Sequence, residues 1–190
     1  MTEEIIEEIR KVSIENNVPI VRNQTGKFIQ KLIDENKYEN ILEIGTAYGY
    51  SSALMLMCDS IKKIDTVEKD EHSFAMAKKH LANETKVNLV NDNAFLYQPN
   101  NNYDFIFLDG PKSHQEELLT KYLEFLKPNG MVLVDNIYLR KFENLPNLTK
   151  NQKSLIKKVD DFRNWLKTNK ELNVEIIDLD DGIAIIKKAK

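Results

Sequence analysis

Short apolar runs alternate with longer amphipathic stretches along this chain. The runs have the length of strands and are bounded by glycine, proline or small polar residues, whereas the stretches between most of them carry apolar residues at helical spacing. The predicted strands are residues 40–44, 61–67, 87–90, 103–108, 131–134, 174–179 and 183–186, and the predicted helices are residues 2–16, 24–36, 50–58, 71–83, 113–126 and 151–168. This alternation predicts an α/β fold with a mainly parallel sheet.

The last two predicted strands leave no room for a helix between them. Residues 180–182, Asp-Asp-Gly, form a tight-turn sequence at that point. We therefore predict a seven-stranded, mainly parallel sheet that ends in an antiparallel C-terminal hairpin. The length suits a single domain over residues 1–190, with N-terminal helices in 1–36 and an irregular loop at 137–150 that overhangs the strand ends.

The composition is typical of a folded protein of the cytoplasm. The hydrophobic share of 42% excludes a disordered chain, and no apolar run is long enough to cross a bilayer. The acidic N-terminus lacks the pattern of a secretory signal. The single cysteine, Cys58, cannot form an internal disulfide. We expect a cytoplasmic location and no membrane partner.

Positive charge is concentrated in residues 137–170, although the whole chain has a net charge of −3. This segment contains nine lysines and arginines and only three acids. Such a run is often no more than a solvated face. The alternative is a patch that faces phosphate groups, and the charge pattern leaves both interpretations open.

Acidic and amide residues stand directly after two predicted buried strands. Asp109 follows the run 103–108, and Asp135 and Asn136 follow the run 131–134. The carboxyl ends of parallel strands meet at one edge of a sheet, where ligands bind. Two carboxylates and an amide oxygen suit Mg2+ or another hard divalent cation. We expect these three side chains to form a metal site.

A glycine turn joins the first predicted strand to the helix that follows. Gly45 and Gly49 allow a tight turn and close approach to a ligand, and Ser51 and Ser52 are suited to cap the helix. Free amides at a helix start bind carboxylate or phosphate. The turn departs from the G-x-G-x-x-G pattern of dinucleotide-binding proteins, so an NAD-dependent enzyme ranks low.

Further polar residues accompany the turn. Glu68 ends the second predicted strand, where an acid suits ribose hydroxyls and repels a 2′-phosphate. Asn93 follows the third strand and can offer an amide oxygen to an adenine amine. Glu43 stands two residues before Gly45, where a helix-capping or salt-bridged acid is the simpler interpretation. The turn, Glu68 and Asn93 in this order favour S-adenosylmethionine as the ligand.

The stretch Leu42-Glu-Ile-Gly-Thr-Ala-Tyr-Gly-Tyr-Ser51 resembles the cofactor turn of the cation-dependent class I O-methyltransferases, which include catechol and caffeoyl-CoA O-methyltransferases. The resemblance covers about residues 18–187. It implies a Rossmann-like class I methyltransferase fold, S-adenosylmethionine and Mg2+ as cofactors, and a homodimer. The cofactor-binding residues that it implies are Val21, Glu43, Gly45, Tyr48, Ser51, Glu68, Asn93, Ala94 and Asp109, and the metal ligands are Asp109, Asp135 and Asn136.

The resemblance also implies a mechanism. Asp109 and Lys112 match the catalytic positions of the family, and Lys112 would act as general base or as a cation that stabilises an oxyanion. A divalent ion lowers the pKa of a hydroxyl that it binds and fixes its position. The substrate should therefore carry two adjacent oxygens, one of which ionises.

Two substrate classes meet this requirement, namely catechol-type phenols and 5-hydroxyuridine. The chain resembles the bacterial tRNA 5-hydroxyuridine methyltransferases most, through residues 18–22 and 181–185. We expect methylation of the wobble uridine to 5-methoxyuridine in the tRNA anticodon loop, whose unstacked bases proteins can read. The expected substrate-binding residues are Arg22, Arg140 and Lys141. An O-methyltransferase of small catechol-type phenols is the alternative.

Overall fold

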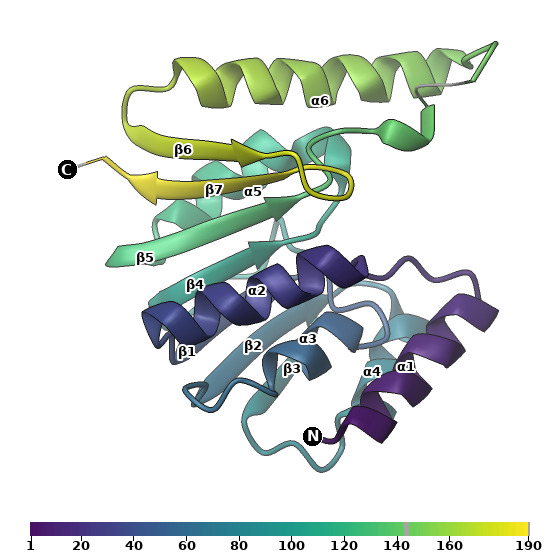
Figure 1. Ribbon diagram of the computed structural model, residues 1–190, viewed down its shortest axis with the longest axis vertical. Coiled ribbons are helices and arrows are strands. Elements are labelled where there is room, and N and C mark those ends of the chain that lie inside the picture. The colour runs from purple at the N-terminus through teal and green to yellow at the C-terminus, as the bar shows by residue number, and fades with distance from the viewer. Residues whose placement is uncertain (143–144, 190) are drawn as a thin grey trace.

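Seven strands form one sheet in the computed structural model of this protein, which describes residues 1–142 and 145–189 (Figure 1). The order across the sheet is β3-β2-β1-β4-β5-β7-β6. The strands are β1 (Asn40–Ile44), β2 (Lys63–Glu68), β3 (Val87–Asn91), β4 (Tyr103–Leu108), β5 (Leu126–Asp135), β6 (Leu172–Ile177) and β7 (Ile183–Lys188). Strands β1 to β5 pair in parallel, and β7 runs antiparallel to β5 and β6. The predicted sheet and C-terminal hairpin are confirmed.

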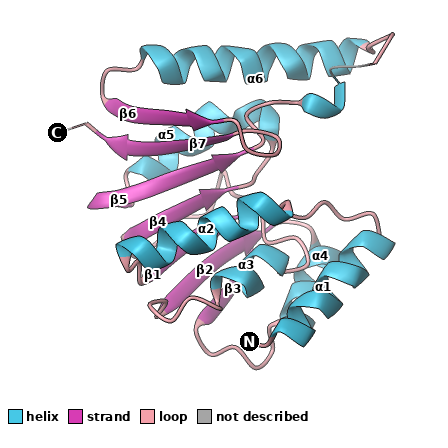
Figure 2. Ribbon diagram, in the orientation of Figure 1, coloured by secondary structure: helices cyan, strands magenta, loops and turns pink. Residues whose placement is uncertain are grey.

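Helices cover both faces of the sheet, and Figure 2 shows α2 in front of it and α5 behind it. The helical elements are α1 (Glu3–Glu15), α2 (Asn23–Asn36), α3 (Tyr50–Met55), α4 (Glu71–His80), η1 (Lys112–His114), α5 (Gln115–Leu123), η2 (Arg140–Phe142) and α6 (Lys150–Thr168). None of the helices in the described ranges is long and apolar enough to cross a membrane. The helices enclose two apolar layers, one on each side of the strands.

Strand residues alternate between these two layers, as the period of a β-strand requires. In β4, Phe105 and Phe107 pack in the layer under α1, α2 and α3, whereas Ile106 and Leu108 pack in the layer under α5 and α6. All four side chains are almost fully buried. A strand covered on both faces reads as a continuous apolar run, which is why the sequence predicted β4 correctly.

The predicted boundaries were wrong around β5. The predicted helix over 113–126 is a 3-10 turn followed by α5, and β5 begins at Leu126 instead of residue 131. The Pro-Asn-Gly sequence of residues 128–130 reads as a turn, but the chain passes through it as an irregular strand. A register shift opposite Tyr103 and Phe105 absorbs the irregularity. The other helices and strands differ from their predicted ends by at most a few residues.

The C-terminal hairpin is fastened to the N-terminal region of the chain. The Asp180 carboxylate accepts hydrogen bonds of 2.9 Å from the backbone N–H and from the hydroxyl of Thr25, in the first turn of α2. Arg22 forms an ion pair of 2.7 Å with Asp181. These contacts bring two segments from opposite ends of the sequence to the carboxyl edge of the sheet.

Candidate active site

The glycine turn approaches another strand closely at the carboxyl edge. Gly45 has a φ of +103°, and a Cβ at this position would lie 2.5 Å from the backbone oxygen of Asp109. The backbone N–H of Asp109 in turn donates to the carbonyl of Ile44 over 3.0 Å. Only glycine fits such a conformation and such a contact. The turn therefore lies directly against the first predicted metal ligand.

Glu43 is fully buried beneath the turn. One carboxylate oxygen accepts a hydrogen bond from the Ser51 hydroxyl, and the other accepts from Ser52 and from Thr66, the last over 2.6 Å. The prediction that both serines cap the helix was wrong, because Gly49 is the N-cap of α3 and the hydroxyls donate to Glu43. Glu43 thus fastens the turn to β2 and to α3.

Burial raises the pKa of Glu43 to about 7, although the three hydroxyl donors lower it and the charge of Asp109 adds a small increase. Because the folded-state pKa exceeds its ordinary 4.5, the neutral acid stabilises the fold at low pH, and this contribution is lost as the pH rises through about 7. Full ionisation should cost about 3 kcal/mol. The free energy of unfolding in urea should therefore fall between about pH 5 and about pH 8, and Glu43→Gln should make this fall smaller.

The exposed Glu8 on α1 offers a matched control, since Glu8→Gln removes a carboxylate that is not buried. Glu8→Gln should keep the pH dependence of the unmodified protein. If the free energy of unfolding of Glu43→Gln depended on pH as it does in the unmodified protein, the ionisation of Glu43 would not destabilise the fold.

A cavity of about 260 Å³ opens at the ends of β1, β2 and β4. Glu68 lies at its rim and is fixed there, since its two carboxylate oxygens accept from the backbone N–H groups of Ala47 and Asp70 over 2.9 and 2.8 Å. A carboxylate retains further lone pairs for ligand hydroxyls. The structure brings five of the predicted cofactor residues to this cavity: Gly45, Glu68, Asn93, Ala94 and Asp109.

The loop after β3 is held by residues that the sequence analysis missed. The Ala94 carbonyl accepts hydrogen bonds from Lys121 Nζ and from the Tyr122 hydroxyl, over 3.1 and 2.7 Å. Asn93 turns its amide oxygen to the backbone N–H of Phe95 at 3.0 Å. That oxygen is thus already engaged, whereas the exposed amide nitrogen of Asn93 still has donors to offer. No local sequence signal marks Lys121, because its target lies on another loop.

Four predicted cofactor residues lie outside the lining of this cavity. Val21 is buried in the apolar layer under α2, and Ser51 donates to Glu43. Tyr48 is also buried, and its hydroxyl lies 3.0 Å from His72 Nε2. Glu43 and Ser51 support the turn from beneath. The contacts of all four residues with the cofactor remain predictions.

Asp109, Lys112, Asp135 and Asn136 gather beside the cavity. Lys112 forms an ion pair with Asp109. Asp135 is almost fully buried, and burial raises its pKa to about 7, with a further increase from the nearby charge of Asp109 and a decrease from Lys112. Asn136 has a φ of +56°, and its backbone N–H donates to the Asp135 carboxylate over 2.7 Å. The strained turn thus holds two predicted ligands at one point.

These residues fit a divalent cation in their chemistry. The charges of Asp109 and Asp135 act on each other in a buried setting, and a cation between them would relieve that repulsion. The described residues contain no cluster of three or more histidine, cysteine or acidic side chains for a metal. The predicted set has only two carboxylates, so water and substrate oxygens would have to complete the shell of Mg2+.

Gln115 is a second residue that the sequence analysis missed. Its buried side-chain amide donates to the Asp135 carbonyl over 2.9 Å, from the first position of α5. A buried glutamine at a helix start resembles any polar residue in the sequence, so no pattern distinguishes it. In the structure it supports the turn that carries Asp135 and Asn136.

A second cavity, of about 250 Å³, opens on the other side of Lys112. It is lined by the predicted substrate-binding residues Arg22, Arg140 and Lys141, together with Pro19, Ile20, Lys112, Asn136, Tyr138, Leu139 and Asp181. Arg140 also pairs with Asp178 at the rim. The predicted loop over 137–150 includes residues 143–144, which lie outside the described part of the chain. Its described part forms one wall of this cavity.

The strand order, the glycine turn and the ligand cavities at the carboxyl edge define a Rossmann-like enzyme of the methyltransferase class. The sequence pattern of the O-methyltransferase family matches residues 1–189. The chain therefore belongs to the O-methyltransferase family, and the predicted enzyme class is confirmed.

One solved structure supports this family assignment, a second agrees with the fold, and a related sequence is similar over most of its length. A "putative caffeoyl-CoA O-methyltransferase" from Staphylococcus aureus superimposes with a TM-score of 0.89 at 34% identity, covering 97% of this chain and 92% of that one. The O-methyltransferase from Bacillus cereus in complex with SAH has a TM-score of 0.82 at 21% identity, covering 100% and 92%. A "putative caffeoyl-CoA O-methyltransferase" of Arabidopsis thaliana is 22% identical over 205 residues, 97% of this chain and 86% of that protein.

Proposed function

We propose that this protein is an S-adenosylmethionine- and Mg2+-dependent O-methyltransferase that converts 5-hydroxyuridine at the tRNA wobble position to 5-methoxyuridine. The observation that carries the proposal is the second cavity, which places Arg22, Arg140 and Lys141 around Lys112 and Asn136. A substrate group with adjacent oxygens would reach the predicted metal ligands there, while the flanking cations meet phosphates.

S-adenosylmethionine is the cofactor that the first cavity supports best. Its lining combines the glycine turn, the acid Glu68 and the loop of Asn93 and Ala94. The Bacillus cereus relative was solved with SAH. Asp109 lines this cavity and pairs with Lys112, so a cofactor bound here would lie beside the predicted catalytic residues.

The chain's own residues have distinct tasks in the transfer. Asp109, Asp135 and Asn136 would hold Mg2+, which lowers the pKa of the substrate hydroxyl when bound. Lys112 accepts the hydroxyl proton or stabilises the resulting oxyanion, because it stands between the two cavities. Gln115 keeps the Asp135 turn in place through its hydrogen bond to the Asp135 carbonyl.

The basic segment gives the reason to favour RNA. Nine lysines and arginines lie in residues 137–170, and the cations nearest the site line the second cavity. The Tyr138 ring has the guanidinium of Arg140 at 5.4 Å and that of Arg163 at 4.7 Å from its centre. Such cation–aromatic arrangements offer surfaces on which an unstacked base can lie.

The second candidate is an O-methyltransferase of small catechol-type phenols. The relatives from Staphylococcus aureus and Arabidopsis thaliana carry the caffeoyl-CoA name, and the caffeoyl group has adjacent phenolic hydroxyls. The pairing of Arg22 and Arg140 with acids favours it too, since each pairing reduces the positive charge free for phosphate. The homodimer remains a prediction that comes from the family resemblance.

Methyl transfer from labelled S-adenosylmethionine tests the proposal. The substrates are tRNA that contains 5-hydroxyuridine, the same tRNA with unmodified uridine, and catechol, each with Mg2+ and with EDTA. We expect Mg2+-dependent label at the wobble uridine, and binding of the tRNA that weakens steeply with salt. Label in catechol alone, with no salt dependence, would overturn the RNA substrate and support the alternative.

A further inference from the structure

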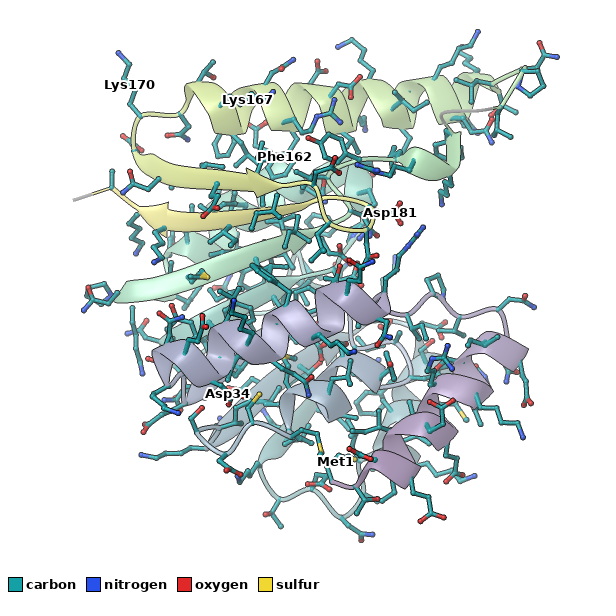
Figure 3. All side chains as sticks on the ribbon, in the orientation of Figure 1. Met1, Asp34, Phe162, Lys167, Lys170 and Asp181 are labelled. Carbon is teal, nitrogen blue, oxygen red and sulfur yellow. The ribbon has the colours of Figure 1, made fainter. Side chains whose placement is uncertain are left out.

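The tip of the β6–β7 hairpin brings an acid into the second cavity. Asp181 lines this cavity together with Lys112, Asn136 and Arg140. Figure 3 labels Asp181 at the hairpin turn, near the N-terminal end of α2. From the sequence alone, residues 180–182 are predicted only to form the turn, because a tight turn fully explains an Asp-Asp-Gly sequence.

The two carboxylate oxygens of Asp181 have different surroundings. One oxygen forms the 2.7 Å ion pair with Arg22. The other, Oδ1, is buried and has no hydrogen-bond partner among the residues that the structure describes. A buried carboxylate oxygen without a donor is costly, so it marks a place where a donor is expected.

The backbone around Asp181 is fixed on three sides. The Asp181 carbonyl accepts from the backbone N–H of Tyr138 over 2.8 Å, and the Gly182 carbonyl accepts from Ile137 over 3.1 Å. Asp180 is held by Thr25. The carboxylate is therefore held at a fixed position in the cavity wall, which is what a selective hydrogen bond requires.

The other charged residues of the cavity act as hydrogen-bond donors in their charged forms. Arg22, Lys112, Arg140 and Lys141 are cations with hydrogen-bond donors, and the guanidinium groups never accept. Among the described residues that line this cavity, Asp181 is the one carboxylate. A substrate group that donates an N–H in this cavity would thus find its matching partner in Asp181.

We propose that Asp181 selects the substrate base by accepting a hydrogen bond, through Oδ1, from a ring N–H that lies next to the chelating oxygens. This inference rests on the proposed function. In 5-hydroxyuracil the ring N3–H stands beside the 4-carbonyl, on the side away from the 5-oxygen. Catechol has no such donor, so the contact distinguishes the two substrate classes. A site built for an N–H rejects analogues that lack it.

The test compares two anticodon stem-loops that differ in one methyl group. One contains 5-hydroxyuridine and the other N3-methyl-5-hydroxyuridine, and catechol is the third substrate. We expect the unmodified enzyme to prefer the N3–H substrate by about 10- to 100-fold in kcat/KM, the range of a hydrogen bond to a charged group. Asp181→Asn should abolish this preference, because Arg22 retains the amide oxygen and leaves a donor facing the substrate.

In Asp181→Asn, the ratio of activity on catechol to activity on the N3-methyl stem-loop should change little, because neither substrate has the N–H donor. The affinity for Mn2+, measured by electron paramagnetic resonance, should fall only slightly, because the charge of Asp181 is only one of several that act on Asp135. Glu175→Gln, at an exposed acid on β6, is the matched control and should keep the preference. Thermal unfolding checks that both variants are folded, and Asp181→Ser serves if the asparagine variant is not.

The outcomes separate the inference from the function on which it rests. Equal use of both stem-loops by the unmodified enzyme would leave the proposed function standing and overturn the role of Asp181. A uniform loss on all substrates together with weaker Mn2+ binding would place Asp181 at the metal centre and also overturn it. Transfer to catechol but to neither stem-loop would overturn the proposed function itself.

Discussion

Asp135→Asn should reduce methyl transfer by about a thousandfold or more while the protein stays folded. The substitution removes one charge from the predicted metal site, and the loss of several kcal/mol of electrostatic stabilisation corresponds to a rate effect of this size. Its oxygen can still accept from the backbone N–H of Asn136, as Asp135 does over 2.7 Å. The measurements are single-turnover rates with Mg2+ and the affinity for Mn2+, and both should fall together.

The thermal stability of Asp135→Asn should not fall with its activity. Asp135 is almost fully buried, and its burial and the charge of Asp109 both disfavour its ionised form. An amide at this position avoids that cost without metal, so the melting temperature should stay the same or rise. Asp59→Asn, at an exposed acid, should change neither property. Undiminished transfer by Asp135→Asn would exclude Asp135 as a metal ligand.

Lys112→Met should lower kcat by about 100- to 10,000-fold, the usual contribution of a proton-transfer group or a positioned charge. Methionine keeps most of the length of the side chain and removes the cation that pairs with Asp109. The affinity for S-adenosylmethionine should change little, because Lys112 lines the second cavity and not the first. Isothermal titration and single-turnover kinetics separate the two quantities.

Lys112→Arg distinguishes the two roles of this lysine. Arginine keeps the positive charge but does not lose its proton in proteins. An electrostatic role predicts substantial recovery of the rate over Lys112→Met, whereas a general base predicts none. The exposed Lys78 on α4 provides the control, since Lys78→Met should leave kcat unchanged. A normal rate in Lys112→Met would remove Lys112 from the mechanism altogether.

The fold was predictable where a strand is covered on both faces. β1 and β4 read as short, mostly apolar runs, and both were placed correctly. β5 was not, because its first half contains the Pro-Asn-Gly of residues 128–130 and pairs through an irregular register. Residues 128–130 have a local preference for a turn, but the parallel pairing of β5 with β4 determines their conformation.

The candidate site was predictable for residues at strand ends and less so for those that support them. Asp109, Asp135 and Asn136 follow strands directly, so their meeting point follows from parallel pairing. Gln115 and Asp181 act through contacts across distant elements, and a single sequence carries no signal of such contacts. Ser51 was predicted to cap the helix and to bind the cofactor, and the hydrogen bond that its hydroxyl donates to Glu43 was not foreseen.

The hydrogen bonds between Thr25 and Asp180 also affect the stage of folding at which the second cavity is formed. The two residues stand 155 positions apart, and Arg22 pairs with Asp181 across a comparable separation. Contacts of such high sequence separation form late in folding, since the intervening chain must be ordered first. The wall that Asp181 provides is synthesised long after the glycine turn of residues 45–49. A nascent chain therefore contains its complete glycine turn long before it can close the second cavity.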